Sequence, residues 1–372
     1  MESIKRNILL NPGPATTSDT VKQAMVIPDI CPRETEFCDI MNSIKLDLPK
    51  VVNGQDEYVA VLFASSGTGG VESAITSAVP KDGKLLIVEN GSYGTRMCKI
   101  AERYSIPYIS YSIAYGDCPD VKAIESLIKS DKNITHLAVI DHETTTGMRN
   151  PVQAICDLAH ENSIEVIVDC MSSYAGLEID LKKWKAEYII SSSNKCIQGM
   201  AGLSFVIFKK ALLEKLKGNS RSFYFDLYEQ YSGFQKSGQM QFTPPVQVVY
   251  ALRKAIDEFF VETSSGRLKR YRQNYETLFN GLEKMGFRFL LPEEQQSGIL
   301  LAVLEPKNPE YSFEAMHDFL YQRNYTIYPG KGAKEATFRL SVLGDLHKDD
   351  IEGFLKTLGE YLLQTGIKKL VY

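Results

Sequence analysis

Short apolar runs alternate with amphipathic stretches from Tyr58 onward, and the alternation continues to about residue 209. Nearly continuous apolar runs separated by helical segments are typical of a mostly parallel sheet that is buried on both faces. The pattern therefore predicts an α/β fold in which a mostly parallel, seven-stranded sheet lies between helices. The expected strands are 58–63, 84–89, 106–113, 136–141, 165–170, 188–193 and 204–209.

The helical pattern lengthens after residue 209. Residues 245–263 and 266–286 each predict one long helix, and Ser264–Ser265–Gly266 interrupts the pattern between them. Shorter strand and helix patterns follow up to the C-terminus. We therefore expect a large domain over 16–265, a smaller α+β domain over 266–372, and an N-terminal segment, 1–15, that joins them.

Composition and charge narrow the function classes. Hydrophobic residues make up 44% of the 372 residues, which is enough for a large core. The net charge of −4 gives no basic surface for nucleic acid or an anionic membrane, although a locally positive pocket for a small anion stays open. No apolar run approaches the roughly 20 residues that span a bilayer, and the first residues do not resemble a signal peptide.

Cysteine and histidine usage argues against disulfides and metals. The seven cysteines are scattered and form no CxxC pair, and the five histidines form no HExxH motif. Neither a disulfide framework nor a metal site is predicted. We expect a protein of the reducing cytoplasm.

A glycine-rich turn, SSGTGG at 65–70, follows the first expected strand and opens a helix. Such a turn presents backbone N–H groups at the positive end of the helix, and the hydroxyls of Ser66 and Thr68 add donors. The turn can therefore hold a phosphate. An ordinary tight turn is the alternative.

A nicotinamide-binding fingerprint is a second alternative for this turn. Gly67 and Gly69 follow a strand, and Glu89 lies 20 residues after Gly69 at the end of the next strand. The third glycine position of that fingerprint is occupied by Glu72, which disfavours a dehydrogenase.

Asp169 lies at the carboxyl end of an apolar strand. A buried carboxylate without a partner is costly, so Asp169 needs a cation or a hydrogen-bond donor. A helix cap or an internal hydrogen bond would satisfy it. A protonated pyridine nitrogen would also do so, because a carboxylate there keeps a pyridoxal ring a good electron sink.

Lys195 follows the strand run 188–193 by two residues, in a turn rich in Ser, Asn and Gly. Most lysines are solvated, but one in a dry pocket loses proton affinity and can form a Schiff base through its amine. Gly199 and Gly202 would let the chain approach a flat cofactor.

Three further residues could surround a ring. Tyr93 lies at a strand-to-helix turn and could stack on it, or could be a turn aromatic only. Thr144 could donate to a ring hydroxyl, although helix capping is the simpler role for a threonine there. Arg339 lies on an apolar segment and could bind a substrate carboxylate, with an internal Asp or Glu as the alternative partner.

With these residues placed, the chain resembles the class V, fold-type I pyridoxal-phosphate aminotransferases over nearly its whole length. Within that class it is most similar to the transaminases of 2-aminoethylphosphonate and pyruvate, mainly through NKCIQG, QFTPP and NPGPATTS. The matching segments are 9–18, 65–73, 90–96, 143–151, 168–173, 193–202, 241–245 and 328–331.

The resemblance implies a role for each residue. Lys195 would bind the cofactor and move a proton, and Asp169 would pair with the pyridine nitrogen. Tyr93 would stack on the ring, and Arg339 would bind the anionic end of the substrate. The resemblance also implies a homodimer with a shared site, in which Thr243 reaches the phosphate of the neighbouring cofactor. The cofactor phosphate of the same subunit would be held by Ser66, Gly67, Thr68 and Asn194.

The implied reaction converts 2-aminoethylphosphonate and pyruvate into phosphonoacetaldehyde and L-alanine. The alternative is an alanine or serine aminotransferase of the same class that uses glyoxylate or pyruvate. A dianionic phosphonate favours a second cation, for which Arg33 is a candidate, although a solvated surface arginine is the simpler interpretation. Met240 and Ala201 depart from residues common in the family, which affects the expected substrate preference.

Two rival functions remain open. A cysteine desulfurase needs a mobile cysteine in its second half, and no cysteine follows Cys196. A non-enzymatic cofactor-binding protein is disfavoured because the lysine, aspartate and arginine are all retained.

Overall fold

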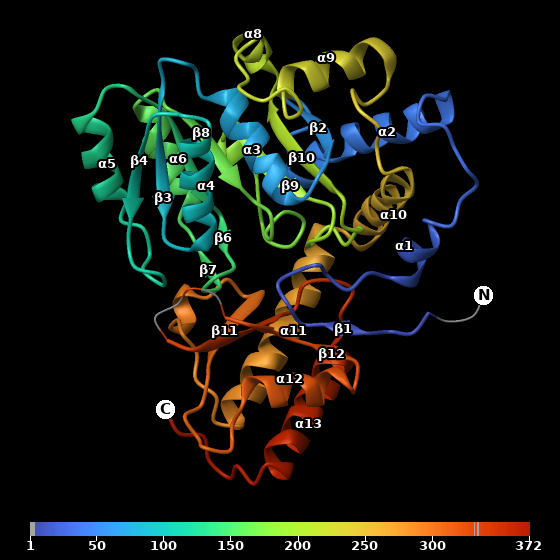
Figure 1. The fold of residues 1–372 in the computed structure, drawn as a ribbon, viewed down its shortest axis with the longest axis vertical. Coiled ribbons are helices and arrows are strands. Elements are labelled where there is room, and N and C mark those ends of the chain that lie inside the picture. The colour runs from blue at the N-terminus through green and yellow to red at the C-terminus, as the bar shows by residue number, and fades with distance from the viewer. Residues whose placement is uncertain (1–3, 331, 333–334) are drawn as a thin grey trace.

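A seven-stranded sheet forms the centre of the computed structural model, which describes residues 4–330, 332 and 335–372 (Figure 1). The strand order is β2-β10-β9-β8-β5-β3-β4, and only β10 runs antiparallel to its neighbours. The mostly parallel α/β sheet is therefore confirmed. Its strands are β2 (Tyr58–Ala64), β3 (Lys84–Glu89), β4 (Tyr108–Ser112), β5 (Ile134–Ile140), β8 (Glu165–Asp169), β9 (Tyr188–Ser192) and β10 (Leu203–Lys209).

Helices cover both faces of this sheet, because alternate side chains of each strand point to opposite faces. Ala60 and Leu62 of β2 pack in one core cluster, whereas Val61 and Phe63 pack in another. The first face is covered by α2 (Thr35–Asp47), η1 (Pro49–Val52), α5 (Val121–Ser130), α6 (Val152–Glu161), α7 (Leu181–Trp184) and α10 (Val246–Glu262). The second face is covered by α3 (Gly67–Ala78), α4 (Ser92–Arg103), η2 (Lys210–Leu212), α8 (Leu213–Leu216) and α9 (Leu227–Ser237).

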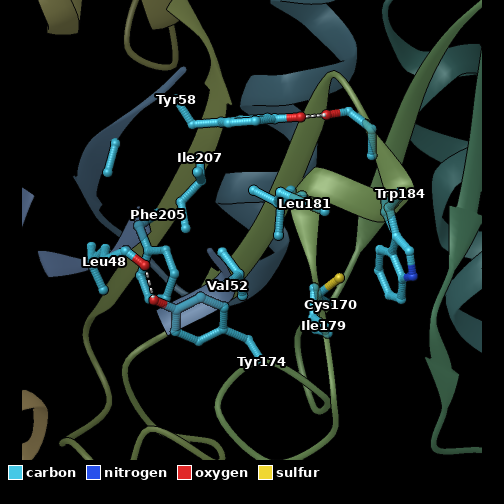
Figure 2. Packing of buried hydrophobic residues seen from close by; sticks show 14 of the residues in the cluster. Leu48, Val52, Tyr58, Cys170, Tyr174, Ile179, Leu181, Trp184, Phe205 and Ile207 are labelled. Atoms are coloured by element: carbon cyan, nitrogen blue, oxygen red, sulfur yellow. Dashed lines mark hydrogen bonds between the residues drawn. The ribbon is translucent and has the colours of Figure 1, made fainter. Parts of the chain in front are cut away.

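Polar atoms that enter the first core find backbone partners (Figure 2). The Tyr174 hydroxyl donates to the carbonyl of Leu48 at 2.6 Å, and the Tyr58 hydroxyl donates to the carbonyl of Ala186 at 2.9 Å. The Tyr174 ring also packs edge-on against Phe205 at 5.0 Å. Both phenols therefore contribute apolar area without leaving a buried hydroxyl unpaired.

A smaller sheet and its helices form a separate core, which lies below the central sheet in Figure 1. The strands are β11 (Leu300–Leu304), β14 (Thr337–Ser341) and β13 (Tyr328–Pro329), in the order β11-β14-β13. They pack with α11 (Ser264–Lys284), α12 (Phe313–Tyr321) and α13 (Lys348–Gln364). A short 3-10 helix, η3 (Glu293–Gln295), precedes β11. The division into domains at residue 265 stays a prediction.

The N-terminal segment joins this second core. Its strand β1 (Ile8–Leu9) pairs in parallel with β12 (Tyr325–Thr326), and Thr16 bridges to Gly344 before α1 (Asp19–Gln23) begins. Two short strands, β6 (His142–Glu143) and β7 (Met148–Arg149), form a hairpin after β5. Among the described residues, every helix is too short or too polar to pass through a bilayer.

The break between the two long helices differs slightly from the expected one. It lies at Thr263, which has a φ of 68°, and not at Ser264–Gly266. The Thr263 hydroxyl accepts a hydrogen bond from the Gly266 N–H at 3.2 Å and so caps α11.

Candidate active site

Four of the expected site residues line one cavity at the carboxyl ends of the parallel strands. Asp169 ends β8, and Lys195 follows β9, the neighbouring strand. Tyr93 lies in the first turn of α4, and Thr144 follows the strand β6. Ligands of open α/β sheets bind at this edge. The complete lining is Tyr93, Ile140, His142, Thr144, Asp169, Met171, Ser172 and Lys195.

Asp169 is a buried carboxylate, 4% exposed, with one direct hydrogen-bond donor. The Met171 N–H donates to its Oδ1 at 2.8 Å, and burial raises the pKa of Asp169 to about 6. The described residues form no ion pair with it, although Arg96 and Lys195 lie close enough to lower its pKa. A cationic group inside the cavity would therefore find a carboxylate that lacks a direct counter-ion.

The amine of Lys195 is held by the N-terminal segment. Its Nζ donates to the carbonyl oxygen of Pro12 at 2.7 Å, and burial lowers the pKa of the amine. Gly13 has a φ of 133° and packs against the lysine side chain, where a Cβ would overlap Nζ. Pro12 and Gly13 of the N-terminal segment therefore contribute to the site itself, which the sequence pattern did not predict.

Two of the apolar side chains that line the cavity come from different elements. The Tyr93 ring comes from α4, and Met171 follows Asp169 by two residues. Met171 packs against Gly67, where a Cβ would overlap its sulfur atom. The sequence analysis missed Met171, although its place in the VDCMSS segment is a local signal for it.

His142 also lines the cavity and was not expected from the sequence. It is 2% exposed, and burial lowers the pKa of its imidazole to about 3, so the ring is neutral. Its Nδ1 lies 2.9 Å from the Ser172 hydroxyl, and its Nε2 is buried without a partner in the part of the chain that the structure describes. This nitrogen could therefore bond to a polar group of a ligand.

The glycine-rich turn presents the N-terminus of α3 to an anion. Ser66 is the N-cap of α3, and its side chain makes no capping hydrogen bond. Thr68 Oγ1 accepts from Arg96 Nη1 at 2.9 Å, and the Arg96 guanidinium lies 4.8 Å from the centre of the Tyr93 ring. A helix N-terminus with an arginine beside it favours an anion. Arg96, within the NGSYGTR segment, was not identified from the sequence.

The nicotinamide alternative finds no support at Glu89. Its carboxylate accepts from the Thr95 hydroxyl at 2.7 Å and from the Ser110 hydroxyl at 2.6 Å, and these bonds help to lower its pKa. Glu89 therefore bonds to hydroxyls of its own protein. Asn194 is also bonded internally, because its Oδ1 accepts from the Ser192 hydroxyl at 3.0 Å.

Arg339 carries a buried guanidinium, 7% exposed, beside the cavity. Its Nε donates to the carbonyl of Pro329 at 3.1 Å, and its Nη1 donates to the carbonyl of Thr144 at 3.4 Å. Burial lowers its pKa, and the nearby Tyr93 and Glu143 oppose that shift. Within the described residues it forms no ion pair, so the internal Asp or Glu partner considered above is not found. Two carbonyls orient the guanidinium without neutralising it.

Arg33 and Thr243 lie outside the cavity lining. Arg33 Nη1 donates to Gln239 Oε1 at 2.9 Å and to the carbonyl of Met240 at 3.1 Å. Thr243 follows Met240 by three residues, and its side chain is exposed. The next residue back, Phe242, packs against the exposed ring of Phe223, with 5.8 Å between the ring centres. The structure therefore places these two expected residues on or beside one loop, 239–243. Lys331, at the end of the last family-like segment, lies outside the described residues.

The residues of the cavity fit pyridoxal phosphate. Asp169 offers a carboxylate for a ring nitrogen, Lys195 offers an amine for an aldehyde, and His142 offers a nitrogen that has no partner among the described residues. The N-terminus of α3 supplies a place for the phosphate.

Comparisons with known proteins show which family and fold this chain resembles. The family model of class-V aminotransferases matches residues 21–341. A 2-aminoethylphosphonate–pyruvate transaminase of Vibrio vulnificus is 40% identical over 348 residues, which cover 93% of this chain and 95% of the relative. One from Lysinibacillus sphaericus is 38% identical over 95% of this chain and 97% of its own length.

Solved structures show the same fold. Ureidoglycine–glyoxylate aminotransferase from Bacillus subtilis superposes with a TM-score of 0.90 at 22% identity, covering 99% of this chain and 96% of that chain. Alanine–glyoxylate aminotransferase from Nostoc sp. has a TM-score of 0.88 at 24% identity, covering 97% and 96%.

Proposed function

This chain belongs to the class-V aminotransferase family, and we propose that it transfers the amino group of 2-aminoethylphosphonate to pyruvate. It is a pyridoxal-phosphate-dependent enzyme, and the products of the reaction are phosphonoacetaldehyde and L-alanine. The observation that carries the substrate class is Arg339, a buried guanidinium beside the cavity that forms no ion pair within the described residues. Relatives that span nearly the whole chain bear the name of this transaminase.

Each cavity residue would contact a different part of the cofactor. Lys195 would hold it through Nζ, Asp169 would pair with the ring nitrogen, and Thr144 would donate to the ring hydroxyl. Tyr93 and Met171 would contact the ring. The phosphate would be held by Ser66, Gly67, Thr68 and Asn194, with Arg96 beside them.

Pyridoxal phosphate, when bound, supplies an electron sink that stabilises a carbanion at the substrate carbon. The protein then has two tasks. Asp169 keeps the ring nitrogen protonated, which maintains that sink. Lys195 Nζ would take the proton from the substrate carbon and deliver it to the cofactor carbon, a task for which a lowered pKa suits an amine at neutral pH.

Arg339 would bind the phosphonate in one half-reaction and the carboxylate of pyruvate in the other. Both groups are clusters of anionic oxygens that match the donors of a guanidinium. Arg33 would supply a second cation to the dianionic phosphonate. The support for Arg33 is its pair of hydrogen bonds to loop 239–243, which also carries Thr243.

We also propose that the enzyme is a homodimer in which Thr243 of each subunit reaches the cofactor phosphate of the other. Its hydroxyl-bearing side chain is exposed, and Phe223, 83% exposed, supplies apolar area near the same loop. The cytoplasm is the proposed compartment, because the seven cysteines are all free thiols. We retain 16–265 and 266–372 as the proposed domains.

Half-reaction spectra test the amino donor. The loaded enzyme is mixed with 2-aminoethylphosphonate, alanine or serine without an acceptor, and the cofactor absorbance is followed. We expect 2-aminoethylphosphonate to convert the cofactor band, and alanine to do so as the product of the second half-reaction. Conversion by alanine and serine but not by 2-aminoethylphosphonate would instead identify the alanine or serine aminotransferase.

A further inference from the structure

A fully buried carboxylate connects two segments that line the cavity. Glu143, the second residue of β6, is 0% exposed. Its Oε1 accepts from the N–H of Thr145 at 3.0 Å and from the hydroxyl of Thr145 at 2.5 Å. Its Oε2 accepts from the N–H of Tyr93 at 3.3 Å. Burial raises the pKa of this carboxyl group, and these donors oppose that shift.

The same bonds cap helix α4 from outside the helix. Its N-cap residue, Gly91, has no side chain that could accept from the first N–H groups. Thr145 Oγ1 accepts from the Ser92 N–H at 3.1 Å, and Glu143 accepts from the Tyr93 N–H. Gly91 lies directly against the Glu143 carboxyl group, where a Cβ would overlap it. A carboxylate at this end also interacts favourably with the helix dipole.

Through these contacts Glu143 is connected to three groups of the site: the Tyr93 ring, Thr144 and Arg339. Tyr93 lines the cavity from the first turn of α4, and Thr144 lines it from the turn that begins at Glu143. The carbonyl of Thr144 in turn accepts from Arg339. Because Glu143 bonds to backbone N–H groups of both segments, it fixes their separation and with it the place of the Tyr93 ring.

We propose that Glu143 is a positioning residue that holds Tyr93 against the cofactor ring. The identity of that ring rests on the proposed function. Replacing one carboxylate oxygen by an amide NH₂ group, as in Glu143→Gln, leaves at least one buried donor without an acceptor. The lost hydrogen bond would therefore weaken cofactor binding by displacing Tyr93, because Glu143 itself would not contact the cofactor.

Glu89, the last residue of β3, is a matched control because its carboxylate also contacts helix α4. Its carboxylate accepts from Thr95, in the first turns of α4, but neither residue is among those that line the cavity. Glu89→Gln therefore perturbs a carboxylate contact with α4 without perturbing the Glu143–Tyr93 contact.

The first experiment measures the dissociation constant of pyridoxal phosphate and the induced circular dichroism of its bound form. We expect Glu143→Gln to raise the dissociation constant roughly 10- to 100-fold and to weaken the induced signal. Glu89→Gln should change the dissociation constant by less than about threefold, the size of an ordinary surface effect. Equal losses in both variants would contradict the proposal, because they would reflect general loosening of α4.

A double-mutant cycle then separates positioning from stability. In a Tyr93→Ala background the ring is absent, so Glu143→Gln should change the dissociation constant by less than about threefold. A full effect in that background would overturn the proposal.

If Glu143→Gln does not fold, Thr145→Val replaces it in the cycle with the same expectation, because it removes the hydroxyl that links Glu143 to Ser92. Failure of the wild-type protein to bind pyridoxal phosphate would overturn the proposed function. If instead the effects of Glu143→Gln and Tyr93→Ala on the binding free energy simply add in the double variant, only the role of Glu143 is overturned.

Discussion

Arg339 donates a hydrogen bond to the carbonyl of Thr144 at 3.4 Å, which ties the smaller sheet to the turn that follows β6. Its Nε bonds to Pro329 on its own sheet. The guanidinium is thus oriented from both sides, and two such bonds use only part of the five donors that it could present to an anion. Substrate binding and the arrangement of the two sheets are therefore linked at this residue.

Arg339 should determine the affinity for both substrates. Arg339→Ala is expected to raise KM for 2-aminoethylphosphonate and for pyruvate by roughly 10- to 100-fold, because it removes a charge-assisted pair of hydrogen bonds. Arg339→Lys should lose part of that affinity, since an ammonium cannot form the two-pronged contact. Steady-state kinetics measure both values, with the exposed Arg323→Lys as control. Unchanged KM values in Arg339→Ala would place the anion elsewhere.

Arg33 should distinguish the two substrates. A dianionic phosphonate gains more from a second cation than a monoanionic carboxylate does. We expect Arg33→Ala to raise KM for 2-aminoethylphosphonate several-fold and to leave KM for pyruvate within about twofold. An equal effect on both substrates, or none, would remove Arg33 from the substrate site.

Asp169 should give cofactor binding a dependence on pH. Its raised pKa of about 6 means that the carboxyl group of the unloaded protein loses its charge as the pH falls through 6. Its contribution to cofactor affinity should then decline, by at most about tenfold per pH unit. The same shift means that the charged group destabilises the unloaded fold above pH 6, so Asp169→Asn should melt at a higher temperature at pH 7.

The Asn variant also provides the control for that pH dependence. Titration of Lys195 persists in it, so only the component near pH 6 should vanish, while turnover falls by about 100-fold or more through loss of the ring-nitrogen partner. An identical binding profile in the wild type and Asp169→Asn would contradict the assigned pairing.

Mixed dimers test the shared site. A Lys195→Ala subunit supplies an intact Thr243, and a Thr243→Val subunit supplies an intact Lys195. If Thr243 acts across the interface, mixing the two inactive or weakened variants restores one complete site per mixed dimer. Activity after subunit exchange should therefore rise above that of either variant alone. If Thr243 acts within its own subunit, no restoration follows.

The central sheet was predictable because its strands are buried on both faces and therefore read as apolar runs. The weakest match is the expected strand 106–113, which the structure shortens to β4, Tyr108–Ser112. This strand lies at the sheet edge and is half-exposed, so its apolar pattern specifies its ends poorly.

The cavity was predictable only where each residue ends a strand or opens a helix. Asp169, Lys195 and Tyr93 carry such local signals. The carbonyl of Pro12 and the carboxylate of Glu143 do not, because their contacts join segments far apart in the sequence. Local pattern does not specify which backbone atoms meet across the fold, so these contributions required the structure.

The central claim is that Lys195 forms the covalent bond to pyridoxal phosphate, and borohydride reduction followed by peptide mapping tests it directly. Lys45 is the sharpest competitor, because burial lowers the pKa of its amine to about 7, and its ammonium lies over the Phe234 ring. We predict that reduction attaches the cofactor to Lys195 in the wild type and in Lys45→Met, and attaches nothing in Lys195→Ala. Attachment at Lys45, or none in the wild type, would contradict the account.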